Sequence, residues 1–276
     1  MAPLALTLAL LAMTVATAAN MVVPLDMAWD SFDDQYRGCG AAMTAALPVL
    51  FRSEFQENPL FAWVWVKAVA EWQRRDSRVS PLSSQAQAIA LTALTMDVRS
   101  VFNADVRVAG RSPRQYRDNF PYKTLHFLLT DALATLRDAH PGQCLDVFRR
   151  DCGAQFAAQP GDTVRFGEFT ITALRKTEGW CSNGTEFQVR TCQGAGIQSF
   201  SEYPEHEGAL IPPFETFEVT EVTREGNKTQ IQLRSTGTSS KYNCEWLKGG
   251  SVPSAPFHLR GLLLATSALA VATGIL

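Results

Sequence analysis

The sequence predicts an α+β fold in a single domain, from two observations. Apolar residues recur at helical spacing up to about residue 140, and from residue 144 onward they alternate as they do along strands. No low-complexity linker or fixed-period repeat separates the two parts. Because a run of helices followed by a run of strands is typical of α+β proteins, we expect a helical region over 40–140 and a β-rich region over 144–247.

Several segments of the first part predict helices by their spacing and their caps. Segment 58–75 repeats apolar residues on one face, and segment 122–139 does so most clearly before a Pro-Gly pair at 141–142 ends it. A serine opens 83–98 and a Ser-Pro pair opens 112–120, and both are typical helix starts. The residues expected on the buried faces are Phe61, Trp65, Ala68, Trp72, Leu125, Leu128, Leu129, Ala132 and Leu136.

The second part alternates apolar and polar residues in short runs. Gly, Pro, Asn and Asp separate the runs, as they do between strands. The expected strands are 144–150 (CLDVFRR), 163–174 (TVRFGEFTITAL), 185–192 (TEFQVRTC), 214–222 (FETFEVTEV) and 228–235 (KTQIQLRS).

Residues 1–18 predict a secretory signal peptide. An apolar run from Leu4 to Val15 ends in Ala16-Thr17-Ala18, which is the small-x-small pattern of a cleavage site. The run is too short to span a bilayer. A permanent N-terminal anchor is the alternative interpretation.

Residues 251–276 predict a glycolipid-anchor signal, which is removed when the anchor is attached. Gly249, Gly250 and Ser251 are candidate attachment sites, and a spacer of about ten residues and an apolar tail of about fifteen follow them. A spanning helix needs about twenty residues, so the tail is short for one. We therefore expect a mature domain over 19–250 on the outer leaflet of the cell surface. A plain tail anchor or a secreted form is the alternative.

The composition argues against nucleic acid and metal partners. A net charge of −2 gives no basic footprint for a phosphate backbone. The chain has four histidines, with His258 in the C-terminal tail, and no C-x-x-C pair, so we expect no metal site. Its six cysteines predict disulfides, since the chain is expected to be secreted. Asn183 and Asn227 begin glycosylation sequons that suit the secretory route.

Five sequence blocks follow one another in order along the mature chain. They are SFDDQYRGC (31–39), CLDVFRR (144–150), RFGEFT (165–170), LIPPFETFEV (210–219) and LRSTGTSSKYNCEWL (233–247). Together they resemble the vertebrate ecto-ADP-ribosyltransferase family, which moves ADP-ribose from NAD to arginine side chains and releases nicotinamide. The resemblance implies NAD as a substrate, arginine residues of secreted or surface proteins as acceptors, and membrane attachment through a lipid anchor.

The resemblance also implies a fold and two disulfides. In the family, an N-terminal helical region packs on a core of two β-sheets, and NAD binds in the cleft between the sheets. The implied disulfides are Cys39–Cys244 and Cys144–Cys192. Cys152 and Cys181 are extra to this pattern, and they either pair with each other or remain free thiols.

Loss of nicotinamide leaves an oxocarbenium-like ribose, and this chemistry sets what the site needs. It needs a cation on the pyrophosphate, a group that orders the ribose and a carboxylate that stabilises the developing positive charge. By resemblance, Arg149 is expected to bind the phosphates, although a surface arginine is the alternative. Arg150 replaces a family glycine that lets the backbone approach the nicotinamide amide. Glu168 and Ser201 are expected to line the cleft.

The other family positions are substituted. Ile171 stands where the family has its catalytic serine. Counting back from Leu-Ile-Pro-Pro, the family's Glu-x-Glu pair falls on His206 and Gly208, so the glutamates Glu205 and Glu207 each lie one residue early. Side chains alternate along an extended segment, so this shift turns both carboxylates to the other face. A bulge at Gly208 that re-aims Glu207 is the alternative.

The sequence therefore predicts the family's reaction class with impaired catalysis. An active transferase that uses Glu207, and more weakly Glu205, is one alternative. The other is an inactive cell-surface relative that binds NAD or another protein.

Overall fold

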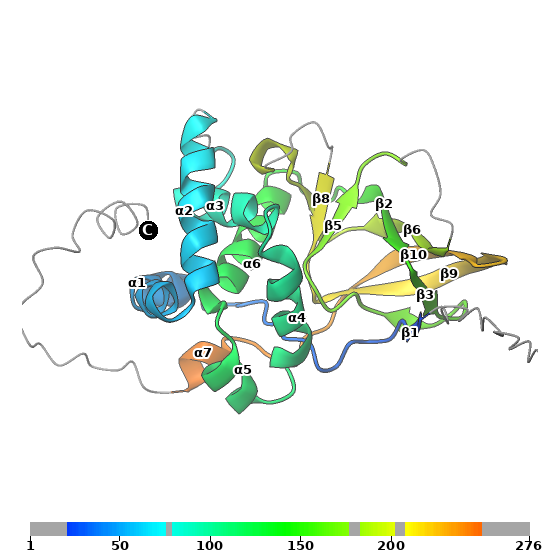
Figure 1. Cartoon of the computed structure of the whole chain (residues 1–276), viewed down its shortest axis with the longest axis horizontal. Helices are drawn as coiled ribbons and strands as arrows, with labels where there is room; N and C mark the ends of the chain where they lie inside the picture. The colour runs from blue at the N-terminus through cyan, green and yellow to red at the C-terminus, as the bar shows by residue number, and fades with distance from the viewer. Residues whose placement is uncertain (1–20, 76–78, 177–182, 202–207, 250–276) are drawn as a thin grey trace, which may run out of the picture.

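The computed structural model describes residues 21–75, 79–176, 183–201 and 208–249. Its helices lie on one side of the molecule and its strands on the other (Figure 1). This arrangement confirms the expected α+β class. The helices are α1 (Gly40–Glu57), α2 (Pro59–Arg74), α3 (Gln85–Leu94), α4 (Arg99–Ala109), α5 (Pro113–Asn119), α6 (Lys123–Asp138) and α7 (Glu245–Lys248).

The strands begin before the helices and resume after α6. They are β1 (Met21–Pro24), β2 (Leu145–Cys152), β3 (Ala154–Ala157), β4 (Thr163–Val164), β5 (Thr170–Ala173), β6 (Gly184–Thr191), β7 (Ala195–Gly196), β8 (Gly208–Ile211), β9 (Glu215–Glu225) and β10 (Lys228–Thr238), with a short 3₁₀ helix over Gln198–Phe200.

The serine caps expected from the sequence are present. The side chain of Ser84 accepts a hydrogen bond from the backbone N–H of Gln87 at the start of α3. Ser112 accepts one from Gln115 at the start of α5, where Pro113 fills the first helical position. These caps satisfy N–H groups that have no partner inside the helix. All the residues expected on the apolar faces of α2 and α6 are buried.

The expected strand 163–174 is wrong as a single element. It is divided into β4 and β5 by a loop in which Gly167 has a φ of +65°. A Cβ at Gly167 would lie 2.4 Å from the Cβ of Ala28, so only glycine fits this turn. Arg165, in the same loop, is buried and forms an ion pair with Asp33 at 2.7 Å. The alternation along the sequence therefore reflects burial in a loop as well as in strands.

The main sheet has two halves that are barely joined. Its strand order is β4-β9-β10-β6-β2-β5-β8-β7, and β1 pairs separately with β3. β2 pairs with β6 along its whole length but with β5 only at Phe148 and Ala173. The two sheets implied by the resemblance thus meet at a single residue pair. The opening between β2 and β5 positions the site described below.

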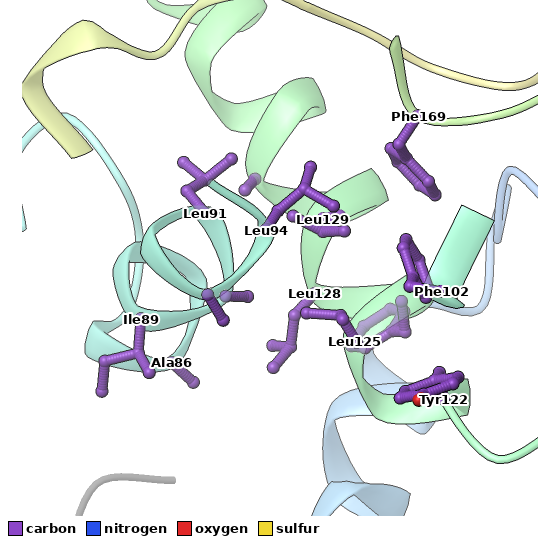
Figure 2. Close-up of a cluster of buried hydrophobic side chains, with 14 of the residues drawn as sticks. Ala86, Ile89, Leu91, Leu94, Phe102, Tyr122, Leu125, Leu128, Leu129 and Phe169 are labelled. Carbon is purple, nitrogen blue, oxygen red and sulfur yellow. The ribbon is translucent and has the colours of Figure 1, made fainter. Parts of the chain in front are cut away.

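Two apolar clusters hold the domain together. One gathers the helices: side chains of α3 face those of α6, and Phe102 and Tyr122 lie beside Leu125 of α6 (Figure 2). Phe169 precedes β5 and enters the same cluster, with its ring 5.6 Å from that of Phe102. The other cluster gathers side chains of the sheet, from β2, β6, β8, β9 and β10. Phe169 therefore attaches the start of β5 to the helices, whereas a single residue pair joins β5 to β2.

Disulfides fasten the ends of these elements. Cys39–Cys244 joins the start of α1 to the start of α7, and Cys144–Cys192 joins the beginning of β2 to the end of β6. Both are the pairs that the resemblance implies. Cys152 is also disulfide-bonded, whereas its expected partner, Cys181, lies outside the described residues. Within the described ranges, none of the helices combines the length and apolar character needed to cross a bilayer.

Candidate active site

A cavity of about 550 Å³ opens where β2 and β5 separate. One wall is β2, and the other is formed by β5 with the first residue of β8 and the N-terminal half of α4. Its volume is in the range of small-molecule and cofactor sites. The lining residues are Thr95, Arg99, Asn103, Phe148, Arg149, Arg150, Asp151, Cys152, Glu168, Phe169, Thr170, Ile171, Thr172, Ala173, Lys176, Glu186, Ile197, Ser201 and Gly208.

Arg149 lies on β2 with its guanidinium group held on several sides. Its Nη1 lies 3.0 Å from Oε1 of Glu168 and donates to Oγ1 of Thr170 at 3.4 Å. Its Nη2 lies 3.1 Å from Oδ2 of Asp151. The guanidinium carbon also lies 5.2 Å from the ring centre of Phe166. Arg149 is thus a well-fixed cation in the cleft wall, at the position expected to meet the phosphates.

Glu168 links the two walls of the cleft. One oxygen pairs with Arg149, and the other pairs with Arg107 of α4. The adjacent backbone is fixed by Asn103, whose side chain donates to the carbonyl of Phe169 at 2.9 Å and accepts from its N–H at 3.1 Å. The segment that leads into β5 is therefore fastened to α4.

Ile171 lies in the middle of β5, opposite Leu210 of β8. It lines the cavity and packs against the helical cluster, and its side chain has no polar atom. The hydroxyls of its neighbours are directed elsewhere: Thr170 lies next to Arg149, and Thr172 donates to the carbonyl of Ala209 at 3.0 Å. The middle of β5 therefore offers the cavity no hydroxyl at the position of the family serine.

Gly208 is the first residue of β8, and it pairs with Ala173 across the ladder. It lines the cavity, where it contributes backbone only. Glu205, His206 and Glu207 lie outside the described residues. Ser201, which precedes them, also lines the cavity and is mostly buried.

Arg150 belongs to a charge cluster with Glu186 and Lys176, which sequence reasoning missed. Its Nη2 lies 3.5 Å from Oε2 of Glu186, the residue opposite it on β6, and Lys176 pairs with the other oxygen of Glu186. Glu186 is only 2% exposed. Buried carboxylates require such pairing. The available sequence signal for Glu186 is only its polar position within the alternation of 185–192.

The fold and the cleft define the class of an ADP-ribosyltransferase. Residues 25–241 match the sequence model of the NAD:arginine ADP-ribosyltransferase family, and the chain belongs to this family. It is 47% identical over 231 residues to the erythroblast NAD(P)(+)--arginine ADP-ribosyltransferase of Gallus gallus, covering 82% of this chain and 77% of the relative. It is 41% identical over 273 residues to the GPI-linked NAD(P)(+)--arginine ADP-ribosyltransferase 1 of Homo sapiens, covering 92% and 84%.

Solved structures agree with this assignment. The eucaryotic mono-ADP-ribosyltransferase ART2.2 superimposes with a TM-score of 0.70 at 33% identity, covering 80% of this chain and 98% of that one. A mutant of the same enzyme in complex with NADH superimposes with a TM-score of 0.68 at 31% identity, with the same coverage. Another mutant of this enzyme was solved in complex with NAD, and NAD is the substrate of the family to which the chain belongs.

Proposed function

We propose that this chain is a cell-surface member of the family that binds NAD through Arg149 but transfers ADP-ribose to arginine at a strongly reduced rate. The observation that carries the proposal is the wall formed by β5 and β8. It presents Ile171 and Gly208 to the cavity where the resemblance places a serine and a glutamate. At these two positions the wall carries an apolar side chain and a glycine, which offer no hydroxyl and no carboxylate.

The cavity fits NAD in its size and in its fixed cation. Arg149 would bind the pyrophosphate, because a guanidinium offers two parallel N–H groups to phosphate oxygens. NAD supplies the reactive glycosidic bond, and the arginine acceptor supplies the nucleophile. The residues of this chain would then have to order the ribose and stabilise its positive charge.

The described residues offer few groups that could order the ribose or stabilise its positive charge. Ile171 cannot donate a hydrogen bond to the ribose, and Gly208 has no carboxylate to place beside it. Removal of one preorganised stabilising group commonly lowers kcat by about 10²–10³. Effects within one site do not add, so we expect a rate at least about 100-fold below that of an active relative.

Nicotinamide release from NAD tests the rate. The full chain, expressed in a secretory host and purified as processed, is incubated with NAD with and without an arginine analogue. We expect release near the uncatalysed background. Acceptor-dependent release at the rate of an active relative would contradict the proposal, because a carboxylate such as Glu207 or Glu205 would then reach the ribose.

Restoration of the missing groups tests the cause. We expect Ile171→Ser combined with Gly208→Glu to raise nicotinamide release at least about tenfold, because each change returns a polar group to the cavity wall. The matched control adds Arg149→Ala to the same pair of changes and should abolish the gain. No gain in the double variant would refute the idea that these positions limit the rate.

Retained NAD binding separates this proposal from the non-enzymatic alternative. A surface protein that uses the fold only as a scaffold for binding another protein would not bind NAD. Equilibrium dialysis with labelled NAD distinguishes the two, and Arg149→Ala identifies the site. The proposed location follows from the terminal segments expected at 1–18 and 251–276, together with the GPI-linked relatives named above.

A further inference from the structure

We propose that Asp151 and Glu168 form a carboxylate clamp on Arg149 that lowers the affinity of the cleft for dinucleotides. The inference rests on the proposed function, since it concerns the same arginine. It also changes the expected role of Glu168 from a contact that holds NAD to a group that competes with it.

The clamp occupies both ends of the guanidinium group. Glu168 lies 3.0 Å from Nη1, and Asp151 lies 3.1 Å from Nη2. These are the two donors that a pyrophosphate would use in a forked contact. A phosphate that approaches Arg149 must displace the two carboxylates or bind beside them, and either outcome opposes binding.

The three side chains of the clamp are partly buried, so solvent screens their charges only in part. The exposed fraction of the side chain is 19% for Arg149, 11% for Glu168 and 29% for Asp151. Ion pairs at such partly buried positions are screened less by salt than pairs on the surface. A negative charge beside a phosphate site therefore weakens anion binding more here than it would on an open surface.

Arg149 also has contacts outside the clamp. Its guanidinium carbon lies 5.2 Å from the ring centre of Phe166 and 6.0 Å from that of Phe187. Thr170 provides a further contact at 3.4 Å. Stacking on aromatic rings holds a guanidinium group in place without neutralising it. Removal of a carboxylate should thus leave the cation where it is and free it for phosphate.

Two of the other basic residues that line the described cavity are also neutralised, whereas Arg99 at the start of α4 is exposed. Arg150 and Lys176 share the buried Glu186, so these lining cations also face a carboxylate. The described wall of the cavity therefore attracts anions less than its number of basic residues suggests. The charges of Asp151 and Glu168 are the ones placed directly on the expected phosphate contact.

The test measures the dissociation constant of NAD for the full chain and for Glu168→Gln and Asp151→Asn. We expect each variant to bind NAD about tenfold more tightly, since a charge is removed next to the phosphate site. Both substitutions keep the shape of the side chain. Binding of adenosine, which has no phosphate, should be unchanged.

Two controls isolate the clamp from general charge effects. Asp146→Asn removes a carboxylate of the same strand that pairs with Arg190 at 3.1 Å, outside the cavity, and it should leave NAD binding unchanged. Arg107→Ala combined with Glu168→Gln should keep the tightening, because the gain comes from Arg149 rather than from the released Arg107.

The outcomes separate the clamp from the proposed function. Equal or weaker NAD binding by both variants, beside measurable binding by the unchanged chain, would overturn the clamp alone. It would show that the carboxylates position Arg149. Absence of NAD binding in the unchanged chain and in every variant would overturn both the clamp and the proposed function.

Discussion

At the scale of single residues, His126 is a buried neutral group whose charge state links stability to pH. It is fully buried in α6, where Nδ1 lies 2.9 Å from the hydroxyl of Tyr36 and Nε2 lies 3.2 Å from the carbonyl of Phe32. A neutral ring satisfies both contacts, by accepting from the tyrosine and donating to the carbonyl. Burial lowers the pKa of His126 from 6.5 to about 3, against the opposing effect of the Phe32 hydrogen bond.

The lowered pKa predicts a loss of stability in mild acid. Below pH 6.5 the unfolded chain is protonated at this histidine, whereas the folded chain is not protonated there until about pH 3. The contribution of His126 to the free energy of unfolding is therefore fully present above pH 6.5. It falls by about 1.4 kcal/mol for each pH unit below 6.5. We expect His126→Gln to weaken this pH dependence. The free energy of unfolding, measured with urea, should fall between pH 7.5 and pH 5.0 by about 2 kcal/mol less in the variant than in the unchanged chain. Equal differences in both proteins would contradict the assignment.

At the scale of elements, β2 and β6 carry a charge pair that belongs to this chain's cleft. Arg150 and Glu186 lie opposite each other in the ladder, so strand register alone brings them together. Glu186 is buried, and removal of one partner leaves its charge poorly compensated. Arg150 therefore has a structural role in this cleft as the partner of Glu186.

This pairing predicts energetic coupling between the two strands. We expect Arg150→Ala to lower the free energy of unfolding by about 1–3 kcal/mol, since Lys176 remains as a second partner of Glu186. Glu186→Leu should remove most of that cost when it is combined with Arg150→Ala. A double-mutant cycle from urea unfolding should give a coupling of at least about 1 kcal/mol. Additive effects of the two changes would contradict the prediction, because they would show that Arg150 and Glu186 are not energetically coupled.

The elements also show how far sequence reasoning reaches. Helices α2 and α6 were predictable because their apolar residues repeat on one face, and α3 and α5 because serines cap them. No individual segment was predicted for α1, which carries Pro48 in its interior, or for α4, which lacks a side-chain cap. The apolar pattern of α1 is weak, so packing defines that helix. In α4 the buried residues Phe102, Val106 and Ala109 do repeat on one face, and only the start signal is missing.

The site divides in the same way. The sequence blocks indicated Arg149, Ile171 and Gly208 as positions of interest, and these line one cavity. The partners Asp151, Glu186 and Lys176 could not be predicted. Their roles depend on which strands become neighbours, in which register, and on where the sheet opens. That information belongs to the tertiary structure.

At the scale of the whole molecule, the element that leads to the expected anchor lies away from the strands that line the cleft. The helix α7 ends at Lys248, directly before the candidate attachment residues Gly249, Gly250 and Ser251. It lies on the helical side, whereas β2, β5 and β8 lie across the molecule (Figure 1). An anchor attached after α7 would leave the cleft accessible to solutes outside the cell.

This arrangement predicts surface display that depends on the last segment. We expect the full chain to appear on the surface of transfected cells and to be released by a phospholipase that cleaves phosphatidylinositol anchors. Removal of residues 251–276 should convert it into a secreted protein. Surface protein that resists the phospholipase would contradict a glycolipid anchor and favour a tail anchor, as flow cytometry with and without the enzyme would show.

The disulfide Cys39–Cys244 would give a molecule anchored at its C-terminus a mechanical property. It ties the start of α7 to the start of α1, so a pull applied at the C-terminus passes through a covalent bond into the helical core. The backbone from β10 to Cys244 carries the rest of the force. In a molecule anchored as proposed, the disulfide would therefore give a second load path that reduces the strain on the strands that line the cleft.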